Sequence, residues 1–283
     1  MAFVLFTVAL VIFLGAVYSA TNITSCTSSV NDQCRQNLTS CSPPPCAFSC
    51  GRKTPQFSCS QDCSPIPSAN ITTGNLCSTL DCQASVYCDQ ICARLNCDST
   101  SCTSRECRQR CVLADCGSMA CRQSVTSCEQ AAWIPQNALI MNCEAKSCNQ
   151  ICQRSSKTVS CDMTCLETVE TCEQKGLTGK FQFRCSGGVK NCTQKTNLYA
   201  IADMVCEAQR CEQACSHSTC SMSCSTRAHE CTQSEDGFGF EVVAMFCDAN
   251  VCRQHCDDTK CNMTCSSAVK EWYQTCKEEN CLA

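Results

Sequence analysis

The chain is poor in the residues that usually build a large hydrophobic core. Of its 283 residues 44% are hydrophobic, but 39 of these are Cys, and only 6% of the chain is aromatic. Ordering the backbone costs about 1–2 kcal/mol per residue, which the remaining apolar side chains are too few to offset by burial. We therefore expect cross-links to carry much of the folding, and we do not expect a large single-core enzyme domain.

Excess positive charge and catalytic motifs are also missing. Lys and Arg number 22 against 26 Asp and Glu, so the net charge is −4, and binding to nucleic acid by phosphate neutralisation is not expected. The sequence contains no zinc-protease, nucleophile-elbow, phosphate-loop or dinucleotide motif. The histidines occupy positions that sister repeats fill with other residue types, which indicates surface substitutions: His217, His229 and His255. We predict a protein that is not an enzyme and has no catalytic, cofactor or metal site.

The cysteines never occur as Cys-Cys, Cys-x-Cys or Cys-x-x-Cys. Metal–thiolate centres and thioredoxin-like redox sites depend on such short spacings, so the sequence favours disulfides. Because 39 is odd, one thiol is left over, either free and buried or bonded to a second molecule. The irregular ends of the pattern supply the candidates for that thiol: Cys26, Cys276 and Cys281.

The first 20 residues predict a secretory signal peptide. They are apolar from Phe3 to Val17 and end in small residues, with cleavage expected after Ser19 or Ala20. An uncleaved membrane anchor is the alternative, but the run is short and lacks a basic flank. We expect a secreted, extracellular protein without a transmembrane anchor, and the secretory pathway makes five sequons candidates for glycosylation: Asn22, Asn37, Asn70, Asn191 and Asn262.

Imperfect repeats organise the rest of the chain. A Pro/Ser/Thr-rich Cys module over 21–76 precedes Cys-repeat blocks at 77–142, 143–205, 206–246 and 247–283. Cys-x-Gln-x-Cys occurs at 88–92, 107–111, 148–152, 211–215 and 252–256, and Cys-x-Met-x-Cys at 161–165, 220–224 and 261–265. The repeats predict the following half-cystines: Cys143, Cys148, Cys152, Cys161, Cys165, Cys172, Cys206, Cys211, Cys215, Cys220, Cys224, Cys231, Cys247, Cys252, Cys256, Cys261 and Cys265.

The fixed middle residue of each unit favours strands over helices. On a strand, residues i, i+2 and i+4 face the same side, whereas on a helix residue i+2 points away from i and i+4. We expect a small disulfide-rich, mainly β fold of short strands, recurring every 9 or 10 residues and stacked as hairpins or as a narrow solenoid. Cys-x4-Cys would form the turns, buried Gln side chains would hydrogen-bond between rungs, and Cys would form a ladder of bridges. Disulfide-stapled helical hairpins are the alternative.

The Cys-x-Gln-x-Cys and Cys-x-Met-x-Cys units, their four-residue spacers and the secretory start resemble cysteine-rich repeat proteins of the secreted and skeletal organic matrix of corals and related animals. The resemblance implies a component of a calcified extracellular matrix, with other matrix components or mineral-associated matrix as partners and a further link through the odd Cys. The leading hypothesis is a secreted structural matrix protein.

The alternative is a secreted protease inhibitor, toxin or defence protein that presents rigid stapled loops. Its candidate loops are the eight-residue insertions 51–58 and 153–160. Both carry basic residues: Arg52 and Lys53 in the first, Arg154 and Lys157 in the second.

Overall fold

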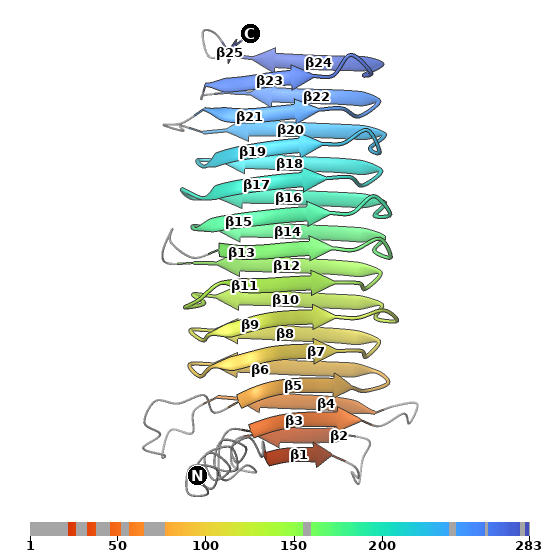
Figure 1. Cartoon of the computed structure of the whole chain (residues 1–283), viewed down its shortest axis with the longest axis vertical. Coiled ribbons are helices and arrows are strands. Elements are labelled where there is room, and N and C mark those ends of the chain that lie inside the picture. The colour runs from red at the N-terminus through yellow and green to blue at the C-terminus, as the bar shows by residue number, and fades with distance from the viewer. Residues whose placement is uncertain are drawn as a thin grey trace, which may run out of the picture.

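The computed structural model describes residues 22–26, 33–37, 46–51, 57–64, 77–154, 160–237, 242–257, 260–277 and 281–282. Within them every regular element is a β-strand, and the strands form a long two-sheet stack that runs from the N-terminal to the C-terminal end (Figure 1). The odd-numbered strands form a 13-stranded sheet, here sheet A, and the even-numbered strands form a 12-stranded sheet, here sheet B.

Sheet A contains the following strands: β1 (Asn22–Cys26), β3 (Cys46–Gly51), β5 (Cys77–Gln83), β7 (Cys97–Cys102), β9 (Cys116–Cys121), β11 (Leu139–Cys143), β13 (Ser160–Cys165), β15 (Lys180–Cys185), β17 (Ile201–Cys206), β19 (Thr219–Cys224), β21 (Val243–Cys247), β23 (Cys261–Cys265) and β25 (Cys281–Leu282). Sheet B contains β2 (Gln33–Asn37), β4 (Ser58–Cys63), β6 (Tyr87–Ala93), β8 (Glu106–Val112), β10 (Ser127–Trp133), β12 (Ser147–Gln153), β14 (Thr171–Leu177), β16 (Asn191–Asn197), β18 (Arg210–Ser216), β20 (Glu230–Asp236), β22 (Val251–Cys256) and β24 (Glu271–Cys276).

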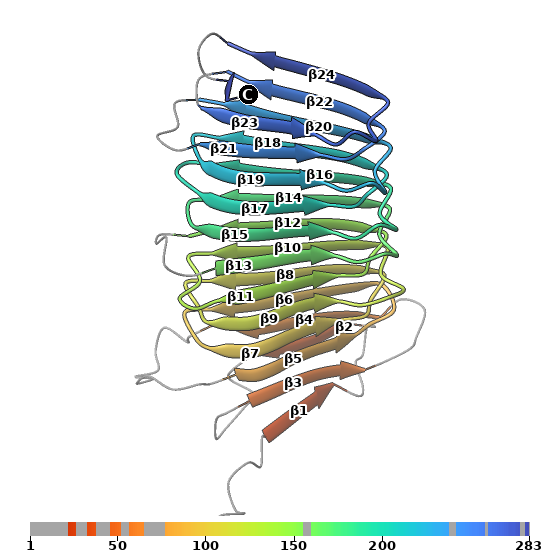
Figure 2. The ribbon, with the colours of Figure 1, turned by 45° about the horizontal axis from the view of Figure 1, so that its top comes forward.

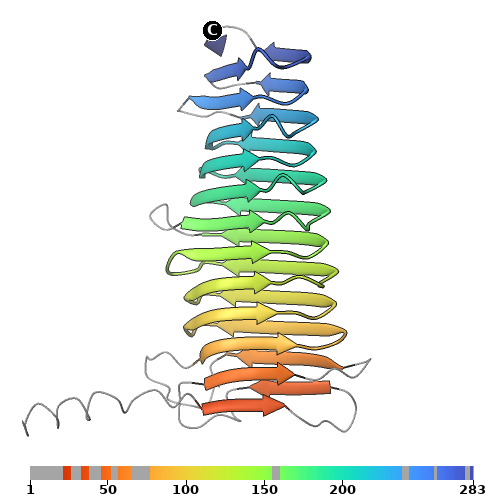
Figure 3. The same cartoon turned by 45° about the vertical axis from the view of Figure 1, so that its right-hand side comes forward.

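The fold is a parallel β-solenoid. Strands that follow one another in the chain lie in opposite sheets, and each strand pairs in parallel with the strands two places before and after it (Figures 2 and 3). The prediction of stacked short strands is therefore confirmed. Stacked hairpins are wrong, because adjacent strands of a sheet are parallel, and helical hairpins are wrong, because the described ranges contain no helix.

Like residues lie above like residues along the stack. In sheet B, Cys211 and Gln213 of β18 align with Cys231 and Gln233 of β20. In sheet A, Met204 of β17 aligns with Met222 of β19. A one-residue slip would turn every inward side chain outward, so this register fixes which side chains form the core.

The proposed blocks at 143, 206 and 247 begin at the last residues of β11, β17 and β21, and sheet A continues past each of these points. Residues 1–20, the predicted signal peptide, lie outside the described ranges. Within those ranges, the structure holds no helix long and apolar enough to cross a membrane. The many disulfides fit an extracellular protein.

Candidate functional site

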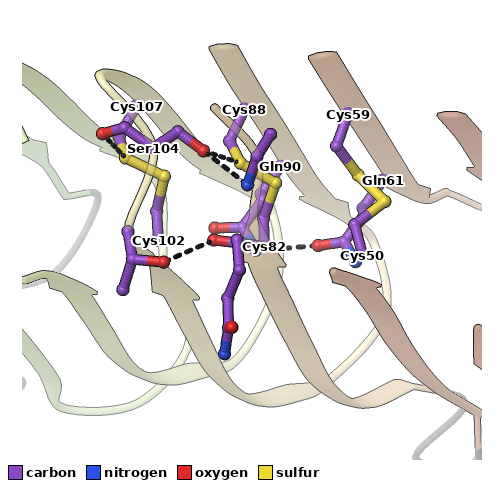
Figure 4. Close-up of a disulfide and its surroundings, with 12 residues drawn as sticks. Cys50, Cys59, Gln61, Cys82, Cys88, Gln90, Cys102, Ser104 and Cys107 are labelled. Atoms are coloured by element: carbon purple, nitrogen blue, oxygen red, sulfur yellow. Dashed lines mark hydrogen bonds between the residues drawn. A yellow bond between two sulfur atoms is a disulfide. The ribbon is translucent and has the colours of Figure 1, made fainter. Parts of the chain in front are cut away.

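The most distinctive chemistry of the molecule lies in its interior, where disulfides close the turns. We call the edge where an odd strand leads into the next even strand the first edge, and the edge where an even strand leads into the next odd strand the second edge. Figure 4 shows three successive first-edge disulfides lying side by side. The first-edge pairs are Cys50–Cys59, Cys82–Cys88, Cys102–Cys107, Cys121–Cys128, Cys143–Cys148, Cys165–Cys172, Cys185–Cys192, Cys206–Cys211, Cys224–Cys231 and Cys247–Cys252.

The second edge carries the remaining described disulfides, which are Cys63–Cys77, Cys92–Cys97, Cys111–Cys116, Cys152–Cys161, Cys215–Cys220 and Cys256–Cys261. Eight Cys-x4-Cys pairs are bonded across a turn at a sequence separation of 5, for example Cys206 to Cys211. Three others lie within single strands and are not bonded to each other: Cys77 and Cys82 in β5, Cys97 and Cys102 in β7, and Cys116 and Cys121 in β9. The prediction that Cys-x4-Cys forms the turns is therefore confirmed for the eight bonded pairs and wrong for the three that span a strand. Each described bond joins strands that are consecutive in the chain.

A column of Gln side chains fills the middle of sheet B's inner face. The Nε2 of each Gln donates to the Oε1 of the Gln one coil earlier, at 2.7–2.9 Å, from Gln61→Gln36 through to Gln274→Gln254. The same Nε2 atoms reach across the core to sheet A: Gln213 Nε2 donates to the carbonyl of Met204 at 3.0 Å. Buried amides are costly unless they are hydrogen-bonded, and this arrangement satisfies donor and acceptor together. The predicted Gln ladder is confirmed.

Apolar side chains on sheet A face the Gln column. The middle inward positions of these strands hold fully buried apolar residues, which are Phe48, Leu80, Met119, Met141, Met163, Phe183, Met204, Met222 and Met245. Thr100, also buried, is the one polar residue among them. A typical coil is therefore only six inward side chains wide: Cys, Met and Cys from sheet A, and Cys, Gln and Cys from sheet B. Four of those six are joined in two disulfides, so sulfur supplies most of the interior.

At the second edge several coils have other residues in place of the two bonded cysteines. One such pair is Gly176 and Phe181, at positions where the coil before has Cys152 and Cys161. A Cβ on Gly176 would lie only 2.6 Å from the Phe181 ring, so the glycine leaves the space that the ring fills. Ala132 takes a Cys position in the same way, aligned with Cys111 and Cys152. The strand stack thus continues where a covalent rung is missing.

Cys265 was expected to be a half-cystine, but it is a free, partly buried thiol. Its Sγ lies 3.5 Å from Gln254 Oε1, and burial raises its pKa. The partner position holds Trp272, which aligns with Cys252 of the coil before.

Cys276, one of the candidates for the odd thiol, is disulfide-bonded, so that prediction is wrong. The side chains of Cys26 and Cys281 lie outside the described residues. The sequence signal for the free thiol is Trp272, which stands where the preceding coil has Cys252.

Within the described residues, three groups of side chains bring their potential ligand atoms close enough together to surround one metal ion. They are Cys63, Cys92 and Cys97; Cys172, Cys185 and Cys192; and Glu235, Cys256 and Cys261. Every cysteine in them belongs to a disulfide. Coordination of a metal by cysteine requires thiolates. In the oxidised protein the first two clusters are therefore stacked disulfides of neighbouring coils, and the third is one disulfide beside the Glu235 carboxylate.

The predicted surface residues fall on the outside of the stack. His217, His229 and His255 are exposed, and each contacts a different polar neighbour. Asn191, at the start of β16, and Asn262, on β23, are exposed and open to modification. Asn70 and the side chains of Asn22 and Asn37 lie outside the described residues.

Ion pairs cross the outer face of sheet B. Arg110 on β8 binds both carboxylate oxygens of Asp89 on β6, at 2.8 and 3.0 Å. Lys195 on β16 pairs with Glu212 on β18 at 2.7 Å. These pairs join adjacent coils, so the charge on this face is largely compensated locally.

Arg154, one of the basic residues of the candidate inhibitory loops, points inward. Only 4% of it is exposed, and its Nη2 donates to the backbone carbonyls of Pro135, at 3.4 Å, and of Asn137. Burial lowers its pKa. A guanidinium held in this way is not available to a protease specificity pocket. Arg52, Lys53 and Lys157 lie outside the described residues.

Comparison with known proteins adds no relative: no family model, curated protein or solved structure matches this chain.

Proposed function

We propose that this protein is a secreted, glycosylated structural component of an extracellular matrix, and that the matrix is a calcified skeletal one. The observation that carries the proposal is the series of disulfides that joins consecutive strands along one continuous stack, ten at the first edge and six at the second. Such cross-links persist in the oxidising environment outside the cell. A molecule whose interior is mostly bonded sulfur serves durability rather than conformational change.

The size of the effect supports durability. The described disulfides close loops with sequence separations of 5 to 14. Restricting loops of this length in the unfolded chain contributes about 2–3 kcal/mol each, although such contributions are not additive. Resistance to heat and proteases follows, and a matrix protein requires both.

The resemblance to coral skeletal matrix proteins supports the calcified setting. The exposed Asn191 and Asn262 would carry their glycans on the outer faces of sheets B and A, away from the packed interior. There the sugars would contact neighbouring matrix components without disturbing the core.

The location of the native protein tests the proposal. An antibody against the folded chain would be applied to secreted fluid, to soft matrix and to the fraction released by demineralisation. Recovery only from insoluble or demineralised material is the expected result. Recovery of all the protein in free secretion would contradict a matrix role.

Protease inhibition is the readout for the rival hypothesis. With Arg154 buried, we expect the oxidised protein to leave trypsin-like proteases active and to remain uncleaved. Inhibition at nanomolar concentration would replace the matrix proposal with the inhibitor.

A further inference from the structure

The two ends of the Gln column differ in exposure. Gln36, in the N-terminal coil, is 4% exposed, and the column stays buried as far as Gln254, at 2%. Gln274, in the C-terminal coil, is exposed. Within the described residues, the Gln column is therefore buried at its N-terminal end and exposed at Gln274.

The open end is the free edge of β24, the last strand of sheet B (Figures 1 and 2). Five of its six residues are exposed, including Trp272 at 62% and Tyr273 at 55%. The amides of Glu271 and Lys277 donate back to the preceding coil, at the carbonyls of Asn250 and Cys256. Because backbone groups alternate in direction along a strand, those of residues 272, 274 and 276 face the open edge.

An unprotected edge strand is a template for another strand. Natural edges are blocked by proline, bulges or inward-pointing charges, and the β24 sequence Glu-Trp-Tyr-Gln-Thr-Cys has no proline and no charge at its inward positions 272, 274 and 276. The only charged residue of β24 is its first, Glu271, and Lys277, which directly follows the strand, is opposite in sign.

We propose that a second copy of this chain docks on the open edge, with the two β24 strands antiparallel about a two-fold axis at Gln274. In this register Glu271 lies opposite the partner's Lys277, and the same pair recurs on the other side of the axis. Residue 272 faces 276 of the partner, so the open backbone groups of each strand meet those of the other. The inward positions of one β24 strand therefore lie opposite the inward positions of the other.

Self-pairing fits better than stacking of this end on the N-terminal end of another molecule. The buried Gln36 shows that the N-terminal end of the column is already covered. Parallel stacking on β2 would also set Glu271 against the uncharged Gln33, in place of a complementary charge. In the two-fold arrangement the Cys265 thiols lie at opposite edges, so the association needs no intermolecular disulfide.

Charge reversal with rescue tests the register. The mass of the oxidised mature chain would be measured by sedimentation equilibrium at low ionic strength, with a dimer expected. By symmetry, Glu271→Lys or Lys277→Glu alone replaces two attractive contacts with two repulsive ones, and we expect each to weaken dimerisation at least about tenfold. The double variant restores both pairs and should restore the dimer.

Lys195→Glu is the matched control. It changes the net charge as Lys277→Glu does, but at a site in the middle of sheet B, where Lys195 pairs with Glu212. It should leave the dimer intact. The Asp257–Lys277 ion pair lost in Lys277→Glu is exposed, with side chains 37% and 62% accessible, so folding should not suffer.

Three results would overturn the proposal. A wild-type chain that stays monomeric would show that β24 does not dock a second copy. Assemblies larger than a dimer point to end-to-end stacking instead. A dimer that is lost on mild reduction or in Cys265→Ser, but is unaffected by either charge reversal, is a disulfide-linked pair and not a β24 pairing.

Discussion

Replacing one buried Gln in the middle of the column should open the stack at that coil. Gln150 is fully buried, and its Nε2 donates to Gln130 Oε1 at 2.8 Å and to the Met141 carbonyl at 3.0 Å. Its Oε1 accepts from Gln174 Nε2 at 2.9 Å. Gln150→Leu keeps the size of the side chain but removes these hydrogen bonds in both directions along the column.

The magnitude follows from the groups left behind. The substitution leaves an acceptor on Gln130 and a donor on Gln174 without this partner, both inside a fully buried core. Each unsatisfied group costs about 1–3 kcal/mol, and burying the additional apolar surface of Leu returns about 1–2 kcal/mol. With mid-range values of both terms we expect a net destabilisation of about 2–3 kcal/mol. It should be concentrated in β10, β12 and β14, because solenoid coils interact mainly with their neighbours.

Hydrogen exchange of the oxidised protein measures this locally. Protection of the β10–β14 amides should fall by about 30- to 150-fold, while that of β20 and β22 stays unchanged. Gln274→Leu is the control, since Gln274 is exposed and makes one bond along the column, to Gln254. If Gln150→Leu exchanged like the wild type, or like Gln274→Leu, the column would not be what joins the coils.

Two further predictions concern single sites. Gly176→Ala places a Cβ 2.6 Å from the Phe181 ring and should destabilise the chain by about 1–3 kcal/mol in denaturant unfolding. Gly51→Ala is the control, because its Cβ meets nothing within 4 Å and should change the stability little. Equal effects of the two substitutions would refute the packing argument. The Cys265 thiol should alkylate slowly at neutral pH and faster as pH rises, with a midpoint above the ordinary cysteine pKa because burial raises it; a plateau below that value would show a thiol that is not desolvated.

The strands and their inward residues could be predicted because the repeat unit has a period that only a strand explains. Gln or Met at the centre of Cys-x3-Cys has to face the same side as both cysteines. The sequence could not decide between hairpins and a solenoid. Both bring Cys-x4-Cys partners together across a turn, and the choice depends on which strands pair at long range.

The free thiol within the described residues, Cys265, was not predicted, for a different reason. Irregular spacing occurs at the ends of the Cys pattern and indicated Cys26, Cys276 and Cys281, of which Cys276 is disulfide-bonded. In the structure, Cys265 has regular spacing and lacks its partner because Trp272 occupies the partner's position. The Gly176–Phe181 pair was also out of reach, because its complementarity depends on two positions that the sequence alone does not place opposite each other.

The disulfides and the hydrogen-bond columns have separate tasks. Every described disulfide joins strands that are consecutive in the chain, whereas neighbouring coils meet as β-strand pairs two places apart, for example β18 with β20. Covalent bonds therefore shape each coil, and the backbone and Gln hydrogen bonds stack the coils. A pulling force on the two ends would separate coils without breaking sulfur bonds.

Extension under force would display this division. The coil from Gln213 to Gln233 contains Cys215–Cys220 and Cys224–Cys231, with sequence separations of 5 and 7 and Cα–Cα spans of 6.2 and 6.3 Å. Bypassing these two turns leaves about 8 freely extensible residues at about 3.4 Å each. With the two Cα–Cα spans added and the folded spacing between coils subtracted, an oxidised coil lengthens by roughly 35 Å. A reduced coil, in which the whole segment from Gln213 to Gln233 extends, lengthens by roughly 65 Å. Steps of the longer size in the oxidised protein would mean that the disulfides do not lie across the turns.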